Sequence, residues 1–237
     1  MGSRVPENDE TLAGIEIFAD LSPARLEAVG RRCRWRHYGP DQQILGHLDE
    51  SRDVYFIVRG KVRATVYSLS GKEVTFRDIP AGQIFGEFAA IDGQPRSANI
   101  VALTDALIAS LSAEAFWEVL RGYPEVSSAT LKLLTRQIRI LSERVFEFSA
   151  LAVKNRIHAE LLRLARDYMA GDNRAVIEPI PTHTDIAQRV STHREAVTRE
   201  LSAMARSGLV ERRDGALVVP DVARLAHLVQ EVLGDQL

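Results

Sequence analysis

The sequence has 237 residues, of which 46% are hydrophobic, so it is long and apolar enough to build one large domain or two modest ones. Its formal net charge of −2 excludes a polycationic surface, and any contact with nucleic acid must come from a few placed side chains. The single cysteine, Cys33, excludes an intramolecular disulfide framework and a cysteine-ligated cluster within one chain, and we expect it to be a small buried side chain.

The N-terminal part of the chain predicts a non-membrane protein that begins with helix. Residues 1–10 are polar and lack the apolar core of a signal peptide, and no run approaches the roughly 18 apolar residues of a membrane span. We therefore expect a cytoplasmic location and no membrane partner. Within residues 12–37 the helical apolar spacing is carried by Ile15, Phe18, Leu21, Leu26 and Val29.

Residues 39–111 are expected to form short strands. The segments 54–60, 61–68 and 74–80 are rich in β-branched and aromatic residues, and Val62, Ala64 and Val66 alternate with polar neighbours. Glycines break the pattern at short intervals, as turns do. This pattern of short strands and glycine turns predicts a small antiparallel β-barrel or roll.

Residues 125–151 are expected to form one long helix. Its apolar residues step by three and four, which is the heptad pattern of a coiled-coil seam and favours a homodimer. The alternative is a single amphipathic helix packed on the roll, although such a helix has a broader apolar face. The predicted seam consists of Leu131, Leu134, Ile138, Leu141, Val145 and Phe148.

The remaining residues predict a helix-turn-helix followed by a β-wing. A helix over 153–169 precedes the stretch 182–209, which divides into two helices around Ser191 and Thr192. The segment RRDGALVV (212–219) then places an Asp-Gly turn between two short strands.

The second helix of this motif has one apolar and one polar face. Val197, Leu201 and Met204 form the inner stripe, and arginines, an acid and hydroxyls lie opposite. Guanidinium and carboxylate groups on an exposed helix suit the major groove, although Glu195 and Arg199 could equally form an ordinary pair four residues apart. The candidate DNA contacts are Arg194, Glu195, Thr198, Arg199 and Ser202.

The stretch FGEFAAIDGQPRSANI, residues 85–100, looks like a strand, a loop and a strand with unusual polar groups. Gly86 frees the backbone for close approach of a ligand, and Glu87 offers an acceptor for a ribose hydroxyl. Arg96 and Ser97 offer a charged fork and a hydroxyl that suit a phosphate. The alternative is that Glu87 and Arg96 only form an ion pair across a turn.

With its FGE and PRSA motifs, this stretch resembles the phosphate-binding cassette of cyclic-nucleotide-binding domains. The order of β-roll, long helix and winged helix-turn-helix resembles the cAMP receptor protein branch of the CRP/FNR family of bacterial transcription regulators, as do ILSERV (140–145) and STHREAVTR (191–199). The resemblance implies an α+β fold: a double-stranded β-helix or jelly roll over 1–124, a dimerisation helix over 125–152 and a winged helix-turn-helix over 153–237.

The resemblance also implies roles for individual residues. Glu87 would bind the ribose 2′-hydroxyl, and Arg96 with Ser97 would hold the cyclic phosphate. Arg194, Glu195 and Arg199 would read a palindromic operator with TGTGA-like half-sites. The implied effector is cAMP, with cGMP possible, and RNA polymerase is the implied protein partner. The expected nucleotide-binding set is Gly86, Glu87, Phe88, Arg96, Ser97, Ala98, Leu141 and Ser142.

Two positions depart from the family pattern. Leu141 replaces a threonine that contacts adenine, whereas Ser142 keeps the hydroxyl that reaches the partner's ligand. Ser191 replaces the usual turn glycine, at little cost if the backbone avoids positive φ.

The six histidines show no metal-ligand spacing and are expected on the surface. We find no catalytic set, so an enzyme is not expected, and the rival hypothesis is a regulator of the same fold that responds to another signal.

Overall fold

The computed structural model describes residues 11–69, 71 and 73–233, in two compact units that meet between Ile138 and Arg139. Each unit is described by itself. The helix α4 (Pro124–Ala150) contributes its first residues to one unit and its last to the other. The predicted domain boundaries at 124 and 152 remain predictions.

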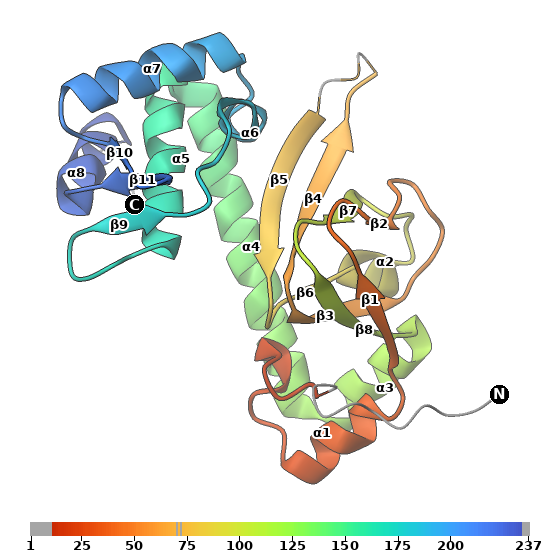
Figure 1. Cartoon of the computed structure of the whole chain (residues 1–237). Coiled ribbons are helices and arrows are strands. Elements are labelled where there is room, and N and C mark those ends of the chain that lie inside the picture. The colour runs from red at the N-terminus through yellow and green to blue at the C-terminus, as the bar shows by residue number, and fades with distance from the viewer. Residues whose placement is uncertain (1–10, 70, 72, 234–237) are drawn as a thin grey trace. The chain divides into compact units, whose positions relative to one another are not determined.

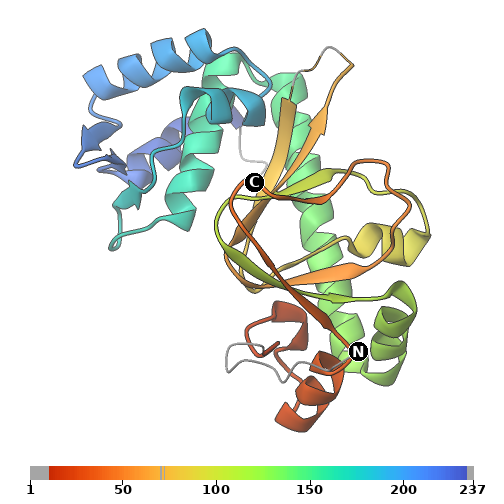
Figure 2. The ribbon, with the colours of Figure 1, turned by 45° about the vertical axis from the view of Figure 1, so that its right-hand side comes forward.

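The first unit contains two four-stranded antiparallel sheets (Figures 1 and 2). Their orders are β1-β8-β3-β6 and β2-β7-β4-β5, and the two sheets together form the predicted roll. The strands are β1 (Arg34–Tyr38), β2 (Gln43–Leu45), β3 (Val54–Arg59), β4 (Lys61–Tyr67), β5 (Glu73–Pro80), β6 (Ile84–Phe85), β7 (Asn99–Ala102) and β8 (Ala106–Leu111).

The alternation predicted for β4 holds over its first half only. Val62 and Ala64 are buried, but the β4–β5 register shifts between Ala64 and Thr65. A bulge of this kind changes which face a side chain takes. Thr65 is therefore buried, whereas Val66 is only half-buried, contrary to the prediction.

One end of the roll is covered by short helices, which Figure 2 shows below the sheets. They are η1 (Glu16–Phe18), α1 (Pro23–Gly30) and α3 (Ala113–Gly122), and their apolar residues pack around Phe56 and Phe116. The helix expected within residues 12–37 is thus two short helices. The apolar residues named for it are nevertheless buried or partly buried in this core.

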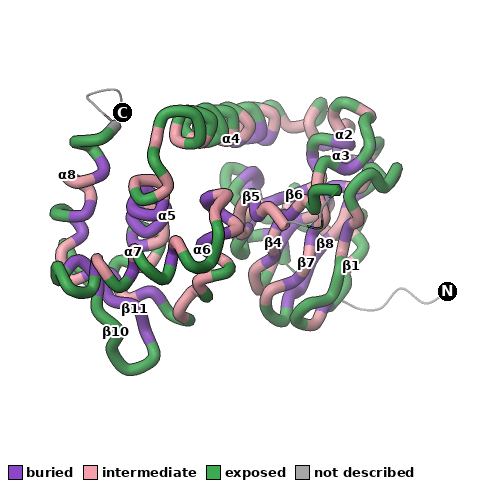
Figure 3. The backbone as a smooth tube through the Cα atoms, turned by 90° about the horizontal axis from the view of Figure 1, so that it is seen from above, coloured by how far each residue is buried: buried purple, intermediate pink, exposed green. Residues whose placement is uncertain are grey.

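The predicted long helix is confirmed as α4. Figure 3 shows much of its surface exposed. Leu131, Ile138 and Val145 are 66%, 63% and 65% exposed, and Leu141 and Phe148 are also exposed. Leu134 instead packs against the core of the roll. Five of the six predicted seam residues therefore present apolar surface to solvent within this single chain.

The second unit is the predicted winged helix-turn-helix. The helices of the motif are α6 (His183–Arg189) and α7 (Arg194–Arg206), and Asp214 and Gly215 turn between the two strands of the wing. The strand β9 was not predicted, because a three-residue run shows no periodicity, and it completes a sheet of order β10-β11-β9. The other elements are α5 (Val153–Asp167), β9 (Ala175–Ile177), β10 (Glu211–Arg213), β11 (Ala216–Val219) and α8 (Val222–Leu233).

Cys33 is partly rather than fully buried. Its Sγ donates to the carbonyl oxygen of Val29 at 3.5 Å. Burial raises the pKa of the Cys33 thiol to about 12, and the nearby Arg32 offsets only part of that shift. Since the thiolate is the reactive form, this cysteine is a packing residue rather than a nucleophile.

Ser191 adopts φ = +50°, so the condition under which serine would be harmless in this turn is not met. The left-handed region costs an L-residue other than glycine about 1–2 kcal/mol. We expect Ser191→Gly to raise the free energy of unfolding by about 0.5–1 kcal/mol, because glycine relieves the strain but loses more backbone entropy on folding. Urea unfolding followed by circular dichroism would measure the change.

The matched control is Ser202→Gly, in the regular helix α7. There glycine replaces a residue with ordinary helical geometry and should lower stability by about 0.5 kcal/mol. If both substitutions lowered stability, the turn at Ser191 would not be strained.

Candidate effector and nucleic-acid sites

Residues 85–100 fold as strand, helix and strand, so the expected strand–loop–strand is wrong. The helix α2 (Glu87–Asp92) lies between Gly86 and Gly93, which have φ of +81° and +71°. The alanines within EFAAID favour a helix, and left-handed glycines delimit it at both ends. Glu87 is therefore the first residue of a helix instead of part of a loop.

Arg96 is the buried centre of this segment, with only 2% of its surface exposed. Its Nη1 donates to the carbonyl oxygen of Gly86 and its Nη2 to that of Asp53, both at 2.8 Å. Its Nε donates to the hydroxyl of Ser51 at 3.1 Å. The guanidinium also lies over the ring of Tyr55. Burial lowers the pKa of Arg96, and nearby tyrosine and carboxylate groups counteract that shift.

Glu87 is also buried, with 3% of its surface exposed. Its Oε1 accepts a hydrogen bond from Nε2 of Gln137 on α4 at 3.3 Å. Burial raises the pKa of Glu87, and Arg77, Gln137 and Arg96 offset part of the shift. Within the described residues Glu87 and Arg96 form no ion pair, so a simple salt bridge does not hold this loop.

The other predicted nucleotide-binding residues divide into two groups. Phe88 and Ser97 are exposed and Ala98 is half-buried, all beside the buried pair. Leu141 and Ser142 are exposed on the part of α4 that belongs to the second unit. Their part in ligand binding therefore stays a prediction. Sequence reasoning missed Gln137, because only the folded chain brings it to Glu87.

The two faces of α7 are as predicted. Val197, Leu201 and Met204 are buried, with exposures of 0%, 9% and 1%. The predicted DNA contacts occupy the opposite, exposed face. They are Arg194, Glu195, Thr198, Arg199 and Ser202.

Contacts that sequence reasoning missed tie α7 to α6 and the wing. Nδ1 of His183 lies 2.7 Å from the Thr198 hydroxyl, and its Nε2 lies 2.9 Å from Nη2 of Arg212. Burial, together with Arg212 and Arg194, lowers the pKa of His183. A neutral ring can accept the Arg212 hydrogen bond, so the imidazole fixes the wing against the first turns of α7.

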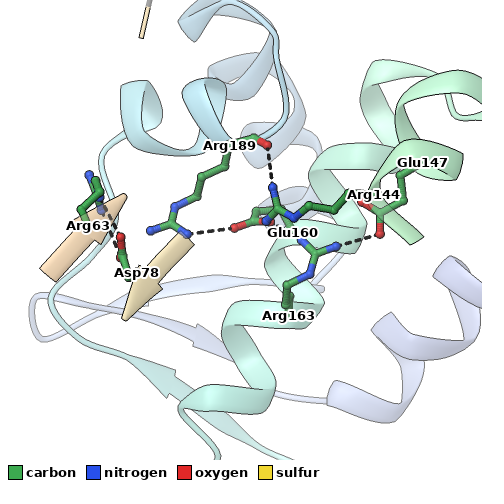
Figure 4. Close-up of polar contacts among 7 residues, drawn as sticks. All are labelled: Arg63, Asp78, Arg144, Glu147, Glu160, Arg163 and Arg189. Carbon is green, nitrogen blue, oxygen red and sulfur yellow. Dashed lines mark hydrogen bonds and ion pairs between the residues drawn. The ribbon is translucent and has the colours of Figure 1, made fainter. Parts of the chain in front are cut away.

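A buried ion network supports the helix-turn-helix from within (Figure 4). Glu160 of α5 is 1% exposed and lies among Arg144, Arg163 and Arg189. Arg144 also donates to the carbonyl oxygen of Arg189 at 3.3 Å, and Arg163 pairs with Glu147 at 2.7 Å. The network therefore joins the last turns of α4 to α5 and to the end of α6.

One histidine contradicts the expectation of surface positions. His158 is 7% exposed, and its Nε2 lies 2.7 Å from Oε1 of Glu200 on α7. Among the residues that the structure describes, no group of three or more His, Cys, Asp or Glu side chains is arranged to hold a metal ion. In the same part of the chain we found no helix with the length and apolarity to cross a bilayer.

Comparisons with known proteins match both units. Residues 35–123 match the cyclic nucleotide-binding domain and residues 155–228 the Crp-like helix-turn-helix domain. The cyclic AMP receptor protein of Thermus thermophilus is 28% identical over 92% of this chain and 98% of its own length. The CRP-like cAMP-activated global transcriptional regulator of Mycobacterium tuberculosis is 24% identical over the same shares.

A solved structure shares the fold. The c-di-GMP responsive global regulator of Xanthomonas campestris superposes with a TM-score of 0.73, covering 84% of this chain and 99% of that one. Its sequence identity is 18%, so the likeness concerns the fold alone.

We expect Gly86→Ala to disrupt the buried Arg96 centre. A Cβ at this position would lie 2.7 Å from Nη1 of Arg96 and 2.9 Å from the carbonyl oxygen of Asp53, at a φ that disfavours alanine. The free energy of unfolding should fall by about 1–3 kcal/mol, as measured by urea unfolding.

The matched control is Gly122→Ala at the end of α3, where nothing lies within 4 Å of the added Cβ and φ is not positive. That change should raise stability by about 0.4–1 kcal/mol. A Gly86→Ala protein as stable as the Gly122→Ala protein would contradict the tight packing around Arg96.

Proposed function

The chain belongs to the CRP/FNR family of transcription regulators, and from that premise we propose that it is a dimeric DNA-binding protein whose operator affinity is set by a cyclic nucleotide. The observation that carries the proposal is the buried pair Glu87 and Arg96, at 3% and 2% exposure, beside the exposed hydroxyl of Ser97. Burying charged groups in a small roll is costly, and such groups are concentrated at functional sites.

The cassette would hold the sugar and phosphate of the ligand. The Glu87 carboxylate accepts from the ribose 2′-hydroxyl, beside the hydrogen bond that it accepts from Gln137. Ser97 donates to the cyclic phosphate, and Arg96 supplies the charge behind it. Phe88 and Ala98 lie beside these groups. The names of the curated relatives point to cAMP as the nucleotide, with cGMP as the other candidate.

A second copy of the chain is the proposed partner of α4. The exposed row of Leu131, Ile138, Leu141, Val145 and Phe148 leaves a long apolar surface in water. Exposed apolar surface of this extent on one helix indicates a protein partner, and the heptad spacing is suited to an identical helix. In such a dimer Ser142 flanks the seam and can reach the ligand of the other copy.

The exposed face of α7 would read DNA. Arg194 and Arg199 offer forks for guanine O6 and N7, and Glu195 offers an acceptor for cytosine N4. A dimer presents two such helices to adjacent major grooves, so the operator is a palindrome, with TGTGA-like half-sites. A protein that binds an operator is a cytoplasmic regulator rather than an enzyme. The family resemblance adds RNA polymerase as a further partner.

Coupling follows from linkage between two states. The nucleotide raises operator affinity only if it binds the DNA-competent state more tightly, and DNA then tightens nucleotide binding by the same factor. Coupling of about 1–3 kcal/mol corresponds to a 5- to 150-fold change in affinity.

A second candidate is a nucleotide-independent DNA-binding regulator of the same fold that responds to another signal. The observation in its favour is that Arg96 already donates to Gly86, Asp53 and Ser51, so the roll can satisfy this guanidinium without a phosphate. Direct titration with cyclic nucleotide distinguishes the two candidates.

We expect Ser97→Ala to weaken cyclic-nucleotide binding about 10- to 150-fold, because it removes one hydrogen bond to a charged phosphate. The melting temperature should not change, since Ser97 is exposed. Calorimetric titration with cAMP and cGMP would measure the loss. Arg96→Ala is a less clean test, because it also leaves the carbonyl oxygens of Gly86 and Asp53 without their donor.

The control for this experiment is Ser22→Ala, an exposed serine whose side chain makes no capping hydrogen bond. Its nucleotide affinity should equal that of the wild type. Equal nucleotide affinities of the wild type, Ser97→Ala and Ser22→Ala would show that Ser97 does not contact the phosphate.

We expect Arg199→Ala to reduce operator affinity by about 1–3 kcal/mol and to relax selectivity at one base pair per half-site. Fluorescence anisotropy with a TGTGA-type duplex and single-base variants would measure both effects. Arg224→Ala, on the exposed side of α8, serves as the charge control. An equal loss on every duplex would make Arg199 a phosphate contact.

A further inference from the structure

A chain of three hydrogen bonds joins the wing to both helices of the helix-turn-helix. Nη2 of Arg212 on β10 lies 2.9 Å from Nε2 of His183, the first residue of α6. Nδ1 of His183 lies 2.7 Å from Oγ1 of Thr198 on α7, and that hydroxyl donates to the carbonyl oxygen of Arg194 at 3.0 Å. The wing and the two helices thus meet at one imidazole.

The groups at the two ends of this chain fix the direction of each hydrogen bond in it. A guanidinium only donates, so Nε2 of His183 accepts from Arg212 and carries no proton. The single hydroxyl proton of Thr198 goes to the Arg194 carbonyl, so Thr198 accepts from Nδ1–H of His183. Burial, Arg212 and Arg194 lower the pKa of His183, which favours the same neutral form. His183 is therefore a neutral imidazole that accepts from the wing and donates to α7.

Arg212 keeps unused donors after its hydrogen bond to His183. The residue is exposed on β10, and a guanidinium has five N–H groups. Within the part of the chain that the structure describes, Arg212 forms no other hydrogen bond and no ion pair. Through His183 and Thr198 it is tied to the helix face that carries Arg194 and Arg199. An arginine fixed there without a carboxylate is suited to bind an anion.

We propose that His183 positions the wing for DNA binding by holding Arg212 where its free N–H groups contact a backbone phosphate beside the base pairs that α7 reads. Thr198 anchors this arrangement, since its hydroxyl has no proton left to donate to a base. The inference rests on the proposed DNA binding by α7. It adds Arg212 to the DNA-contacting residues and makes His183 a positioning residue that acts through Arg212.

A phosphate contact is stronger when the arginine is positioned before DNA binds. An exposed arginine on a three-residue strand has many rotamers, and fixing them on binding costs free energy. The hydrogen bond to His183 fixes Arg212 already in the free protein. Contacts to the DNA backbone in turn set the register and orientation of the helix that reads the bases. His183 therefore raises operator affinity without touching DNA.

The test is fluorescence anisotropy of the full-length protein with saturating cAMP or cGMP, at several salt concentrations. The duplexes are a TGTGA-type palindrome and a shuffled sequence of the same length. The variants are Arg212→Ala, His183→Ala, the double variant, and His183→Gln, whose carboxamide keeps a donor and an acceptor. The control is Arg213→Ala, which removes the next arginine of β10. Arg213 points to the opposite face of the strand and pairs with Asp214 at 3.6 Å.

We expect Arg212→Ala to weaken both duplexes equally and to reduce the slope of log affinity against log salt by about 0.9 per phosphate contact, or about 1.8 per dimer. His183→Ala should weaken operator binding about 2- to 12-fold per half-site, the cost of ordering a released arginine, and leave the slope unchanged. The double variant should bind like Arg212→Ala, whereas His183→Gln and Arg213→Ala should bind like the wild type. Thr198→Val, which removes the anchoring hydroxyl, should match His183→Ala and replaces it if that variant does not fold.

Two results would overturn the inference while the proposed function stands. An unchanged salt slope in Arg212→Ala would show that Arg212 contacts no phosphate. A loss from His183→Ala that is as large in the Arg212→Ala background as in the wild type would show that His183 does not act through Arg212. If the wild type bound neither duplex, with or without nucleotide, the proposed function would fail, and this inference with it.

Discussion

The organisation of the cassette depends on one buried guanidinium. Arg96 donates to the carbonyl oxygens of Gly86 and Asp53, which joins the start of α2 to the loop before β3. Backbone hydrogen bonds reinforce the arrangement, since the Arg96 amide donates to the Asp49 carbonyl and the Leu48 amide to the Arg96 carbonyl. Because a buried charge without partners is very unfavourable, this geometry is strongly specified. It also requires glycine at position 86 and thereby turns Glu87 inward.

The second unit uses the same principle with the charges reversed. There a buried carboxylate, Glu160, is surrounded by three arginines and fixes α5 against the end of α6 and the last turns of α4. Removing one partner from such a network leaves an uncompensated buried charge, so it tends to hold one arrangement. A two-state regulator needs a rigid recognition unit and a rigid ligand cassette. Ligand binding then affects DNA binding through movements of whole units, and not through local unfolding.

Local sequence patterns were sufficient for much of this architecture. The period of α7 separated Val197 and Leu201 from the exposed arginine face, and alternation identified β4 up to its bulge. What failed depends on tertiary context. The burial of His158 arises from its contact with Glu200, which lies far away in the sequence. The left-handed backbone of Ser191 belongs to the turn between α6 and α7, where no periodic pattern reveals it. Periodicity also cannot detect a three-residue strand such as β9 or the register shift between β4 and β5, which decides which face a side chain takes.

The central claim is that nucleotide binding in the cassette and DNA binding through α7 are thermodynamically coupled. Calorimetric titration of the purified protein with cGMP and with cAMP, each with and without a saturating TGTGA-type duplex, tests it most directly. We predict that the duplex tightens nucleotide binding by about 5- to 150-fold, and that the nucleotide tightens duplex binding by the same factor. A nucleotide affinity that is the same with and without the duplex would contradict it.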